Sequence, residues 1–450
     1  GYPDLLTAFK EVHRPSDIKL AELARQRLTF DEAYLLQLTL LQRKEALGKV
    51  QTIARIPKVD GVLAQFDKQL PFELTPGQRE VSAQIFGDLK SEHPMHRLLQ
   101  GEVGSGKTIV ALRAALNVID AGAQVALLAP TEVLAQQHHR TILKQLGALA
   151  TKGQLGAPEE AIEISLLTGS LSAAEKREIQ ARCKDGQINL VIGTHALLSE
   201  AVNFSDLGLV IVDEQHRFGV EQRDALRAKA KTPPHLLVMT ATPIPRTVAI
   251  TVFGDLDIST LTELPLGRAP IATHLVNAMT KPAYLERAWQ RIKEEVKAGH
   301  QAYVVAPRIS SETAEDADIE FLFGTESKDL NSVTNLAPEL STGPLKGLKI
   351  ALLHGKLPPD EKEATMQAFS NKQIEVLVAT SVIEVGVDVP NATVMVIMDA
   401  DRFGISQLHQ LRGRVGRGEA PGLCLLVTCV AEDSPAFERL NAVASTLDGF

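Results

Sequence analysis

The sequence predicts an α/β protein in which a helical segment precedes two tandem domains, each built on a parallel β-sheet. Three observations predict this fold. From about residue 70, short apolar runs alternate with helical patterns; the pattern breaks at a Pro/Gly-rich segment at 264–270; and a second series of apolar runs follows it. The runs are continuous rather than alternating, which indicates strands buried on both faces, as in parallel sheets.

The N-terminal segment is helical in pattern. Ser16 is the expected N-cap of a long helix, and residues 31–42 continue its apolar stripe. The chain starts with Gly1 rather than Met, so we expect a fragment of a longer protein. The predicted divisions are a helical linker at 1–62, a first α/β domain at 63–267, a second at 268–430 and a truncated helical tail at 431–450.

The expected strands form two series. The first comprises His96–Gln100, Val125–Ala129, Ile162–Leu167, Leu190–Gly193, Leu209–Val212 and Leu236–Met239. The second comprises Ala302–Ala306, Ile350–Leu353, Val376–Ala379, Val394–Met398 and Leu423–Val427. The acidic stretch Glu312–Glu339 lacks a sustained apolar period, which predicts an exposed insertion.

Composition bounds the class of protein without deciding its function. The chain has 450 residues, of which 44% are hydrophobic and 23% charged, as in ordinary globular proteins. No apolar run approaches the ~18 residues that cross a bilayer. The net charge of −8 argues mildly against nucleic-acid binding, but local Lys and Arg decide phosphate contact. Cys183, Cys424 and Cys429 lack metal-ligand spacing, and we expect small core residues in a reducing cytosol.

The loop Gly101–Thr108 carries the clearest chemical signal. It fits the pattern G-x-x-x-x-G-K-[ST], in which backbone N–H groups surround phosphates, and a strand pattern precedes it while a helix pattern follows. Lys107 is expected to contact the β- and γ-phosphates. The loop residues are therefore predicted to bind ATP: Gly101, Glu102, Val103, Gly104, Ser105, Gly106, Lys107 and Thr108. A glycine-rich turn without a ligand is the alternative.

Two adjacent acids follow the apolar strand Leu209–Val212. Asp213 is suited to hold Mg²⁺ together with Thr108, and Glu214 to orient and deprotonate the attacking water. A solvated strand end is the alternative. His216 is the histidine that we expect to be functional, because it lies beside Glu214. For His195 and His354 a structural and a catalytic role are equally open.

A basic run, Gln410–Arg417, lies far along the chain in the second domain. Its Arg414 and Arg417 are expected to neutralise charge on the transferring phosphoryl group as arginine fingers. A nucleotide held between this run and the phosphate loop would join the two domains, and hydrolysis would separate them. This arrangement is typical of a molecular motor.

The order of motifs resembles that of superfamily-two helicases. The residues within these motifs resemble those of the RecG family of bacterial branched-DNA helicases. The matching segments are Phe72–Gln78, Gly101–Thr108, Ala129–Gln136, Thr168–Ser170, Gly193–Leu197, Asp213–Val220 and Met239–Thr247, then Leu353–Lys356, Val378–Pro390 and Gln407–Arg417. The transcription–repair coupling ATPase shares several of them, but it would have Asp-Glu-Glu-Gln where this chain has Asp213–His216.

The resemblance implies two RecA-like lobes and further site residues. Phe72 would stack on adenine, Gln78 would contact the base edge, and Gln410 would help to sense the nucleotide. Gly386 and Asp388 would touch the nucleotide from the second lobe, and Thr240 and Thr242 would couple hydrolysis to strand binding. Phosphates of one DNA strand would be held by Thr131, Gly169, Thr194 and Thr380. Each of these threonines has a helix cap as its alternative role.

The implied function is ATP-dependent translocation on double-stranded DNA, in replication-fork regression, branch migration, recombination and repair. A related duplex translocase of the transcription–repair coupling type, or a nucleotide-gated DNA-binding scaffold without turnover, is the alternative. Expected partners are ATP, Mg²⁺ and forked DNA, with single-stranded-DNA-binding protein as a further candidate, for a cytoplasmic, nucleoid-associated monomer. Residues 1–62 resemble the linker helices after the family's wedge domain. A translocation hairpin is expected soon after Phe450, so this fragment is expected to hydrolyse ATP but to remodel forks poorly.

Overall fold

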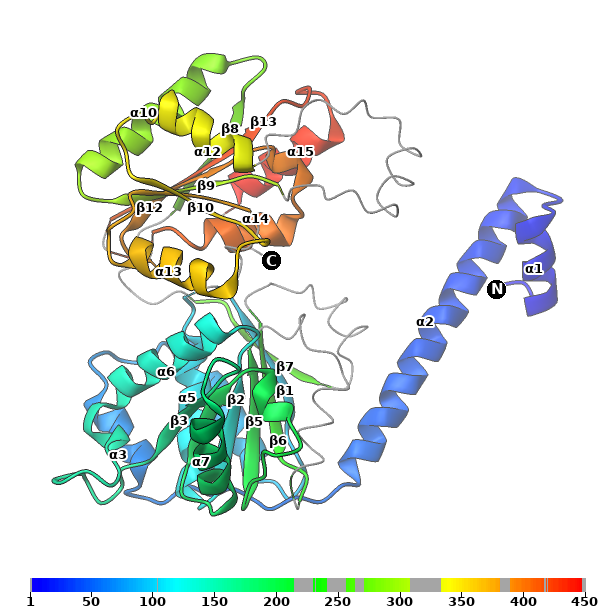
Figure 1. Cartoon of the computed structure of the whole chain (residues 1–450). Coiled ribbons are helices and arrows are strands. Elements are labelled where there is room, and N and C mark those ends of the chain that lie inside the picture. The colour runs from blue at the N-terminus through cyan, green and yellow to red at the C-terminus, as the bar shows by residue number, and fades with distance from the viewer. Residues whose placement is uncertain are drawn as a thin grey trace.

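A computed structural model describes residues 2–102, 104–213, 230, 232–240, 256–263, 271–307, 333–380, 389–416, 418 and 420–446. Two sheet domains lie one above the other, and we call them lobe 1 and lobe 2 in chain order (Figure 1). Helices α1 (Leu5–His13) and α2 (Ile18–Gly48) pack together as a hairpin that stands apart from both lobes. No described helix is long and apolar enough to span a membrane.

Lobe 1 is built on a seven-stranded sheet in which every pair of neighbouring strands is parallel, in the order β3-β4-β2-β5-β6-β1-β7. The strands are β1 (His96–Gly101), β2 (Gln124–Leu128), β3 (Ile164–Leu167), β4 (Leu190–Gly193), β5 (Leu207–Asp213), β6 (His235–Thr240) and β7 (Asp257–Leu261). Its helices are α3 (Val62–Gln69), α4 (Pro76–Leu89), α5 (Lys107–Asp120), α6 (Glu132–Leu146) and α7 (Ala173–Lys184). Neighbouring Leu98 and Leu99 on β1 belong to separate core clusters, because successive side chains leave opposite faces of the sheet.

Lobe 2 repeats this plan with six parallel strands in the order β10-β11-β9-β12-β13-β8. The strands are β8 (Ile271–Asn277), β9 (Gln301–Val305), β10 (Ile350–Leu353), β11 (Val376–Ala379), β12 (Ala392–Ile397) and β13 (Gly422–Thr428). Its helices are α10 (Pro282–Lys297), α12 (Val333–Thr342), α13 (Pro359–Ser370), α14 (Ile405–Arg412) and α15 (Pro435–Ser445). Because the strands of each sheet are parallel, their carboxyl ends meet at one edge, where ligands bind in open α/β sheets.

The predicted pair of parallel-sheet domains after a helical segment is confirmed, and the expected strand series are all present. Two further strands, β7 and β8, were not predicted. Both lie at sheet edges, and their exposed and buried residues partly alternate, so they lack the continuous apolar run that marked the central strands.

Two smaller expectations were wrong, and a third is largely untested. Asp17, not Ser16, caps α2, because the Asp17 carboxylate accepts the Lys19 N–H while the Ser16 hydroxyl donates to Glu11. Most of the acidic stretch 312–339 lies outside the described residues, so its expected exposure stays a prediction; α12 begins at its end and buries Leu336. Cysteines 183 and 424 lie in the core as expected, with pKa values raised to about 12 by burial, but Cys429 is exposed.

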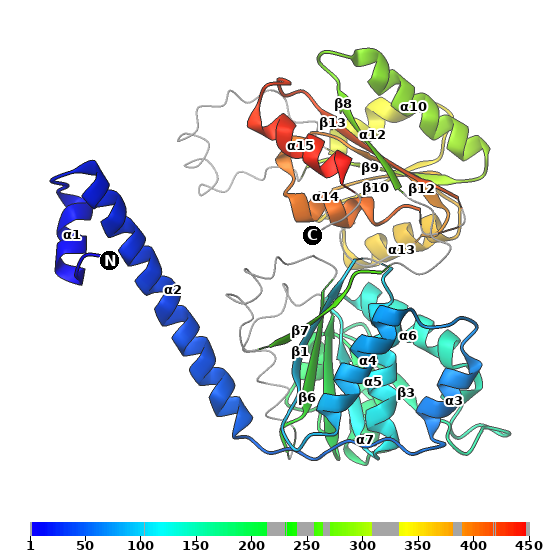
Figure 2. The same cartoon turned by 180° about the vertical axis from the view of Figure 1, so that it is seen from behind.

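The segment between α2 and α3 runs along one end of lobe 1 (Figure 2). Arg55 is buried there and makes a bidentate ion pair with Asp206, at 2.7 and 2.8 Å, just before β5. The Asp120 carboxylate accepts the N–H groups of Val62 and Leu63, which satisfies donors at the start of α3. These contacts hold the segment that follows α2 against the edge of the sheet opposite the phosphate loop.

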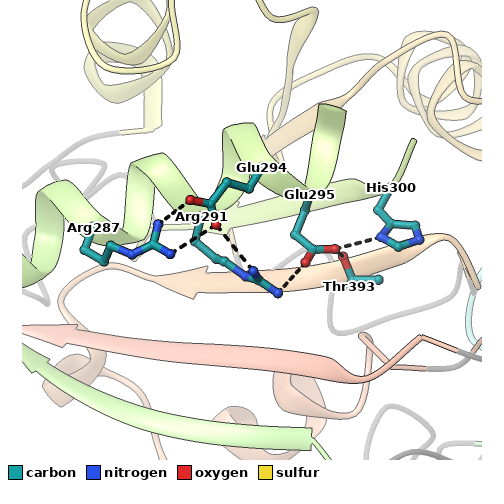
Figure 3. Close-up of polar contacts among 6 residues, drawn as sticks. All are labelled: Arg287, Arg291, Glu294, Glu295, His300 and Thr393. Carbon is teal, nitrogen blue, oxygen red and sulfur yellow. Dashed lines mark hydrogen bonds and ion pairs between the residues drawn. The ribbon is translucent and has the colours of Figure 1, made fainter. Parts of the chain in front are cut away.

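An ion network holds the last turns of α10 against the sheet of lobe 2 (Figure 3). Glu295 accepts a hydrogen bond from the Thr393 hydroxyl on β12 at 2.7 Å, and its carboxylate also pairs with Arg291 and His300. Burial raises the pKa of Glu295, but the hydrogen bonds from Thr393 and His300 and the Arg291 charge outweigh it, so the pKa lies below its ordinary value. The network lies at the amino ends of β9 and β12, and we assign it a structural role.

Candidate active site

The phosphate loop follows β1 at the carboxyl edge of lobe 1 and depends on its glycines. Gly104 and Gly106 have φ of +87° and +89°, a conformation that favours glycine. A Cβ on Gly106 would lie 2.2 Å from Nε2 of Gln78, and one on Gly101 would lie 2.6 Å from Oγ of Ser105. The loop therefore has no room for a side chain at Gly101 or Gly106, as in a loop whose N–H groups surround an anion.

Lys107 is the first residue of α5, and its ammonium is folded back onto its own loop. Nζ donates to the carbonyl oxygen of Gly101 at 2.7 Å and to that of Glu102 at 2.9 Å. Thr108 follows in the first helical turn and is half-buried. A cation at the start of a helix is unfavourable for the helix dipole. A bound anion would offset this cost, since the same helix end and the same ammonium would both contact it.

Gln78 links the helix α4 to the phosphate loop. Its side chain is buried, with Nε2 donating to the Ser105 carbonyl at 2.9 Å and Oε1 accepting from Thr75 N–H, in a capping box. The carboxylate of Glu263, just after β7, accepts from the N–H of Gly77 at 3.1 Å and helps to fix this turn. Phe72 precedes the turn with half of its surface exposed. The adenine roles of Phe72 and Gln78 remain predictions.

Asp213 ends β5 at the same edge of the sheet, and His138 on α6 contacts it. Nε2 of His138 lies 2.7 Å from Oδ2 of Asp213, and the two side chains are only 11% and 13% exposed. His138 was not among the residues predicted from the sequence. The signal available was its place on the helix that begins within the motif Ala129–Gln136, but no spacing rule connects His138 with a residue as distant in sequence as Asp213.

Several predicted residues lie outside the described part of the chain, so their positions are not assigned. They are Val103, Glu214, His216, Thr242, Gly386, Asp388 and Arg417. Thr240, at the end of β6, is described and buried. Within the described residues, no three His, Cys, Asp or Glu side chains form a metal-binding group.

In lobe 2, Gln410 and Arg414 lie at and just after the end of α14, and both are buried. Arg412, between them, serves the fold: its guanidinium donates to the carbonyls of Val443 and Thr446 at the end of α15. The ligand-binding role of Arg414 remains a prediction.

The four predicted strand-binding residues all follow strands at the carboxyl edges of the two sheets. Thr131 follows β2, Gly169 follows β3, Thr194 follows β4 and Thr380 follows β11. Thr131 is also the N-cap of α6, accepting from Leu134 N–H at 3.3 Å, so its alternative role as a cap is realised. His195 is exposed and His354 half-buried, and the choice between a structural and a catalytic role stays open for both.

Comparison with known proteins gives matches in both lobes. Residues 75–250 match the DEAD/DEAH box helicase family, and residues 285–419 match the helicase conserved C-terminal domain. The ATP-dependent DNA helicase RecG of Mycobacterium bovis is 56% identical over 445 residues, which cover 98% of this chain and 60% of the relative. RecG of Bacillus subtilis is 42% identical over 448 residues, covering 100% and 61%. The chain thus spans about 60% of the length of these curated relatives.

Solved structures agree with this comparison. A structure of RecG bound to a three-way DNA junction superposes with a TM-score of 0.79 at 39% identity, covering 98% of this chain and 54% of that chain. The yeast protein Dbp5, solved with RNA and ADP BeF3, superposes with a TM-score of 0.58 at 15% identity, which is a likeness of fold alone. These likenesses confirm the predicted pair of RecA-like domains.

Proposed function

This chain belongs to the RecG family of ATP-dependent DNA helicases, and on that premise we propose that it couples ATP hydrolysis to movement on double-stranded DNA. The process served would be fork regression and branch migration in recombination and repair. The observation that carries the proposal is the geometry of the phosphate loop, in which the Lys107 ammonium donates to two carbonyls and a Cβ at Gly101 or Gly106 would clash. The phosphates of a bound triphosphate would accept the hydrogen bonds that this ammonium donates to the two carbonyls.

The residues of lobe 1 divide the chemistry between them. Lys107 and the N–H groups of its loop bind and orient the phosphates. Asp213 and Thr108 present a carboxylate and a hydroxyl, the hard oxygen donors that fit Mg²⁺, which would neutralise charge on the phosphate oxygens when bound. Glu214 orients and deprotonates the attacking water. His138 holds the Asp213 carboxylate through Oδ2.

Lobe 2 supplies the positive charge that completes the site. Arg414 and Arg417 stabilise the charge that develops on the transferring phosphoryl group, an effect typically worth ~10³–10⁵ in rate. Gln410, Gly386 and Asp388 contact the nucleotide from the same lobe. Because these groups belong to the second lobe, hydrolysis and product release change the separation of the lobes.

The DNA partner is expected to be held through its phosphates. Thr131, Gly169, Thr194 and Thr380 follow strands at the carboxyl edges of both sheets and present hydroxyl or backbone groups rather than base-reading side chains. Such contacts are independent of sequence, which suits a motor that moves along any DNA. Branched DNA is the proposed substrate, single-stranded-DNA-binding protein a candidate partner, and a monomer in the bacterial cytoplasm, near the nucleoid, the proposed working form.

One experiment separates this function from its alternatives. ATP turnover is measured with forked DNA, linear duplex, single-stranded DNA and RNA at equal nucleotide concentration. Strongest stimulation by forks supports the branched-DNA motor. Equal stimulation by fork and linear duplex would favour the transcription–repair coupling type of translocase, and nucleotide-dependent DNA binding without any turnover would favour the scaffold.

A further inference from the structure

The two lobes contain the same strand–helix–strand unit, matched without insertion or deletion. The unit β3–α7–β4 of lobe 1 corresponds to β10–α13–β11 of lobe 2, with four-residue strands and twelve-residue helices in both. The strand pairs also keep one register, since Ile164 pairs with Leu190 in lobe 1 and Ile350 pairs with Val376 in lobe 2. A constant sequence offset therefore relates the two units.

Buried polar contacts confirm the correspondence at single residues. Gln124 begins β2 and Gln301 begins β9, the strands that pair with β4 and β11. Nε2 of Gln124 donates to the carbonyls of Cys183 and Ile188, and Nε2 of Gln301 donates to the corresponding carbonyls, those of Phe369 and Ile374. Residues at matching positions can therefore be compared directly.

One matched contact lies at the carboxyl edge, where DNA is expected. Nζ of Lys176 on α7 donates to the Gly169 carbonyl at 2.6 Å, and Nζ of Lys362 on α13 donates to the Gly355 carbonyl at 2.6 Å. Both glycines are exposed and both lysines are half-buried. In each lobe the loop neighbours a buried threonine that follows the adjacent strand, Thr194 in lobe 1 and Thr380 in lobe 2.

A lysine near the start of a helix carries an electrostatic cost. Lys176 and Lys362 both lie in the first turns of their helices, where the helix dipole favours anions over cations. The Gly carbonyl uses one of the three N–H bonds of each ammonium, which leaves donors for an anion. In lobe 1 the Glu132 carboxylate already accepts the Ser170 N–H at 3.2 Å, so this amide is used, whereas the Lys176 ammonium is a cation that would attract a phosphate.

We propose that Lys176 and Lys362 are a matched pair of phosphate-binding residues, one in each lobe, that contact two phosphates of the same DNA strand. The inference rests on the proposed function and deepens it. Each lysine also fixes its loop through the Gly carbonyl, so both lobes present the cation in the same geometry. A motor whose two lobes move alternately along DNA needs an equivalent phosphate contact in each lobe.

The test measures how DNA affinity depends on salt. A fluorescent forked duplex is titrated at several KCl concentrations with wild type, Lys176→Met, Lys362→Met and the double variant. Each lost phosphate contact should lower the slope of log affinity against log salt by about one, and weaken binding about tenfold near 0.1 M salt. The double variant should lose about two units of slope, while Lys176→Arg and Lys362→Arg should retain nearly the full slope.

Lys184→Met is the matched control. Lys184 is exposed in the last turn of α7, at the opposite edge of the sheet, so its removal should leave the slope unchanged. Wild-type slopes in both Met variants would overturn the proposal, as would an equal loss in the control. Failure of the wild type to bind DNA at all would overturn the proposed function as well. An unchanged midpoint of thermal unfolding shows that each variant is folded.

Discussion

The imidazole of His138 lies 2.7 Å from the carboxylate of Asp213, although 75 positions separate them in the sequence. Both side chains are largely buried, and Asp213 ends β5, which lies two strands away from β1, the strand that leads to the phosphate loop. The contact occupies Oδ2 and so restrains the carboxylate in one orientation. A hydrogen bond of this kind commonly raises the metal affinity of a carboxylate, because the carboxylate is already oriented before the ion binds.

We expect His138→Ala to lower ATP turnover about tenfold or more, the usual cost of losing a group that orients a metal ligand. The concentration of Mg²⁺ needed for half-maximal turnover should rise, and that shift, measured by titration at saturating ATP, separates an orienting role from general damage to the fold. His139→Ala on the same helix is the control. An unchanged Mg²⁺ requirement in His138→Ala would contradict the assignment.

Substitutions of Lys107 and Glu214 are expected to have different effects on nucleotide affinity and ATP turnover. Lys107→Ala should lose both nucleotide affinity and turnover, because the ammonium contacts phosphate in the ground state and in the transition state. Glu214→Gln should still bind a fluorescent ATP analogue but turn over ~10²–10⁴-fold more slowly, since only proton transfer is removed. Equal turnover in wild type and Glu214→Gln would show that another group activates water.

The sequence could predict those features of the structure that depend on residues close together in the chain. The central strands were predictable because burial on both faces leaves continuous apolar runs, and the phosphate loop because glycines must recur at fixed spacing. Edge strands such as β8 expose one face and leave no such run. The contacts of His138 with Asp213 and of Gln78 with Ser105 join separate segments, so no local pattern could indicate them. The equivalence of Lys176 and Lys362 likewise required both lobes to be compared in space.

Gly106→Ala should weaken nucleotide binding about tenfold or more. The added Cβ would lie 2.2 Å from Nε2 of Gln78, and the residue would have to keep a positive φ, which costs an L-residue ~1–3 kcal/mol. Equilibrium titration with an ATP analogue measures the effect. Gly87→Ala is the matched control, because Gly87 lies in α4, where an added Cβ would have nothing within 4 Å, and helix propensity favours the exchange by up to about 1 kcal/mol. Equal nucleotide affinity in the two variants would show that the loop can relax.

His235 should make lobe 1 less stable in mild acid. The ring is fully buried at the start of β6, and its Nδ1 accepts the Met95 N–H at 3.0 Å, so this nitrogen carries no proton. Burial lowers the pKa of His235 to about 4, against 6.5 for an exposed histidine; the Ile53 carbonyl opposes the shift and the Arg55 charge adds to it. The folded state therefore binds fewer protons than the unfolded chain between pH 6.5 and pH 4.

The direction in which the free energy of unfolding changes with pH follows from that difference in proton uptake. Stability from neutral His235 is fully present above pH 6.5 and declines as the pH falls toward 4, because the unfolded chain gains a proton that the folded state excludes. Between pH 7 and pH 5 the free energy of unfolding should fall by about 2 kcal/mol through this group. Urea titrations at the two pH values measure the free energy of unfolding of wild type and of His235→Gln. The difference between the two proteins gives the contribution of His235, because the other titrating groups are common to both. The variant should be less stable at pH 7 but lose less stability on acidification, and an identical loss in both proteins would mean that His235 does not control the response.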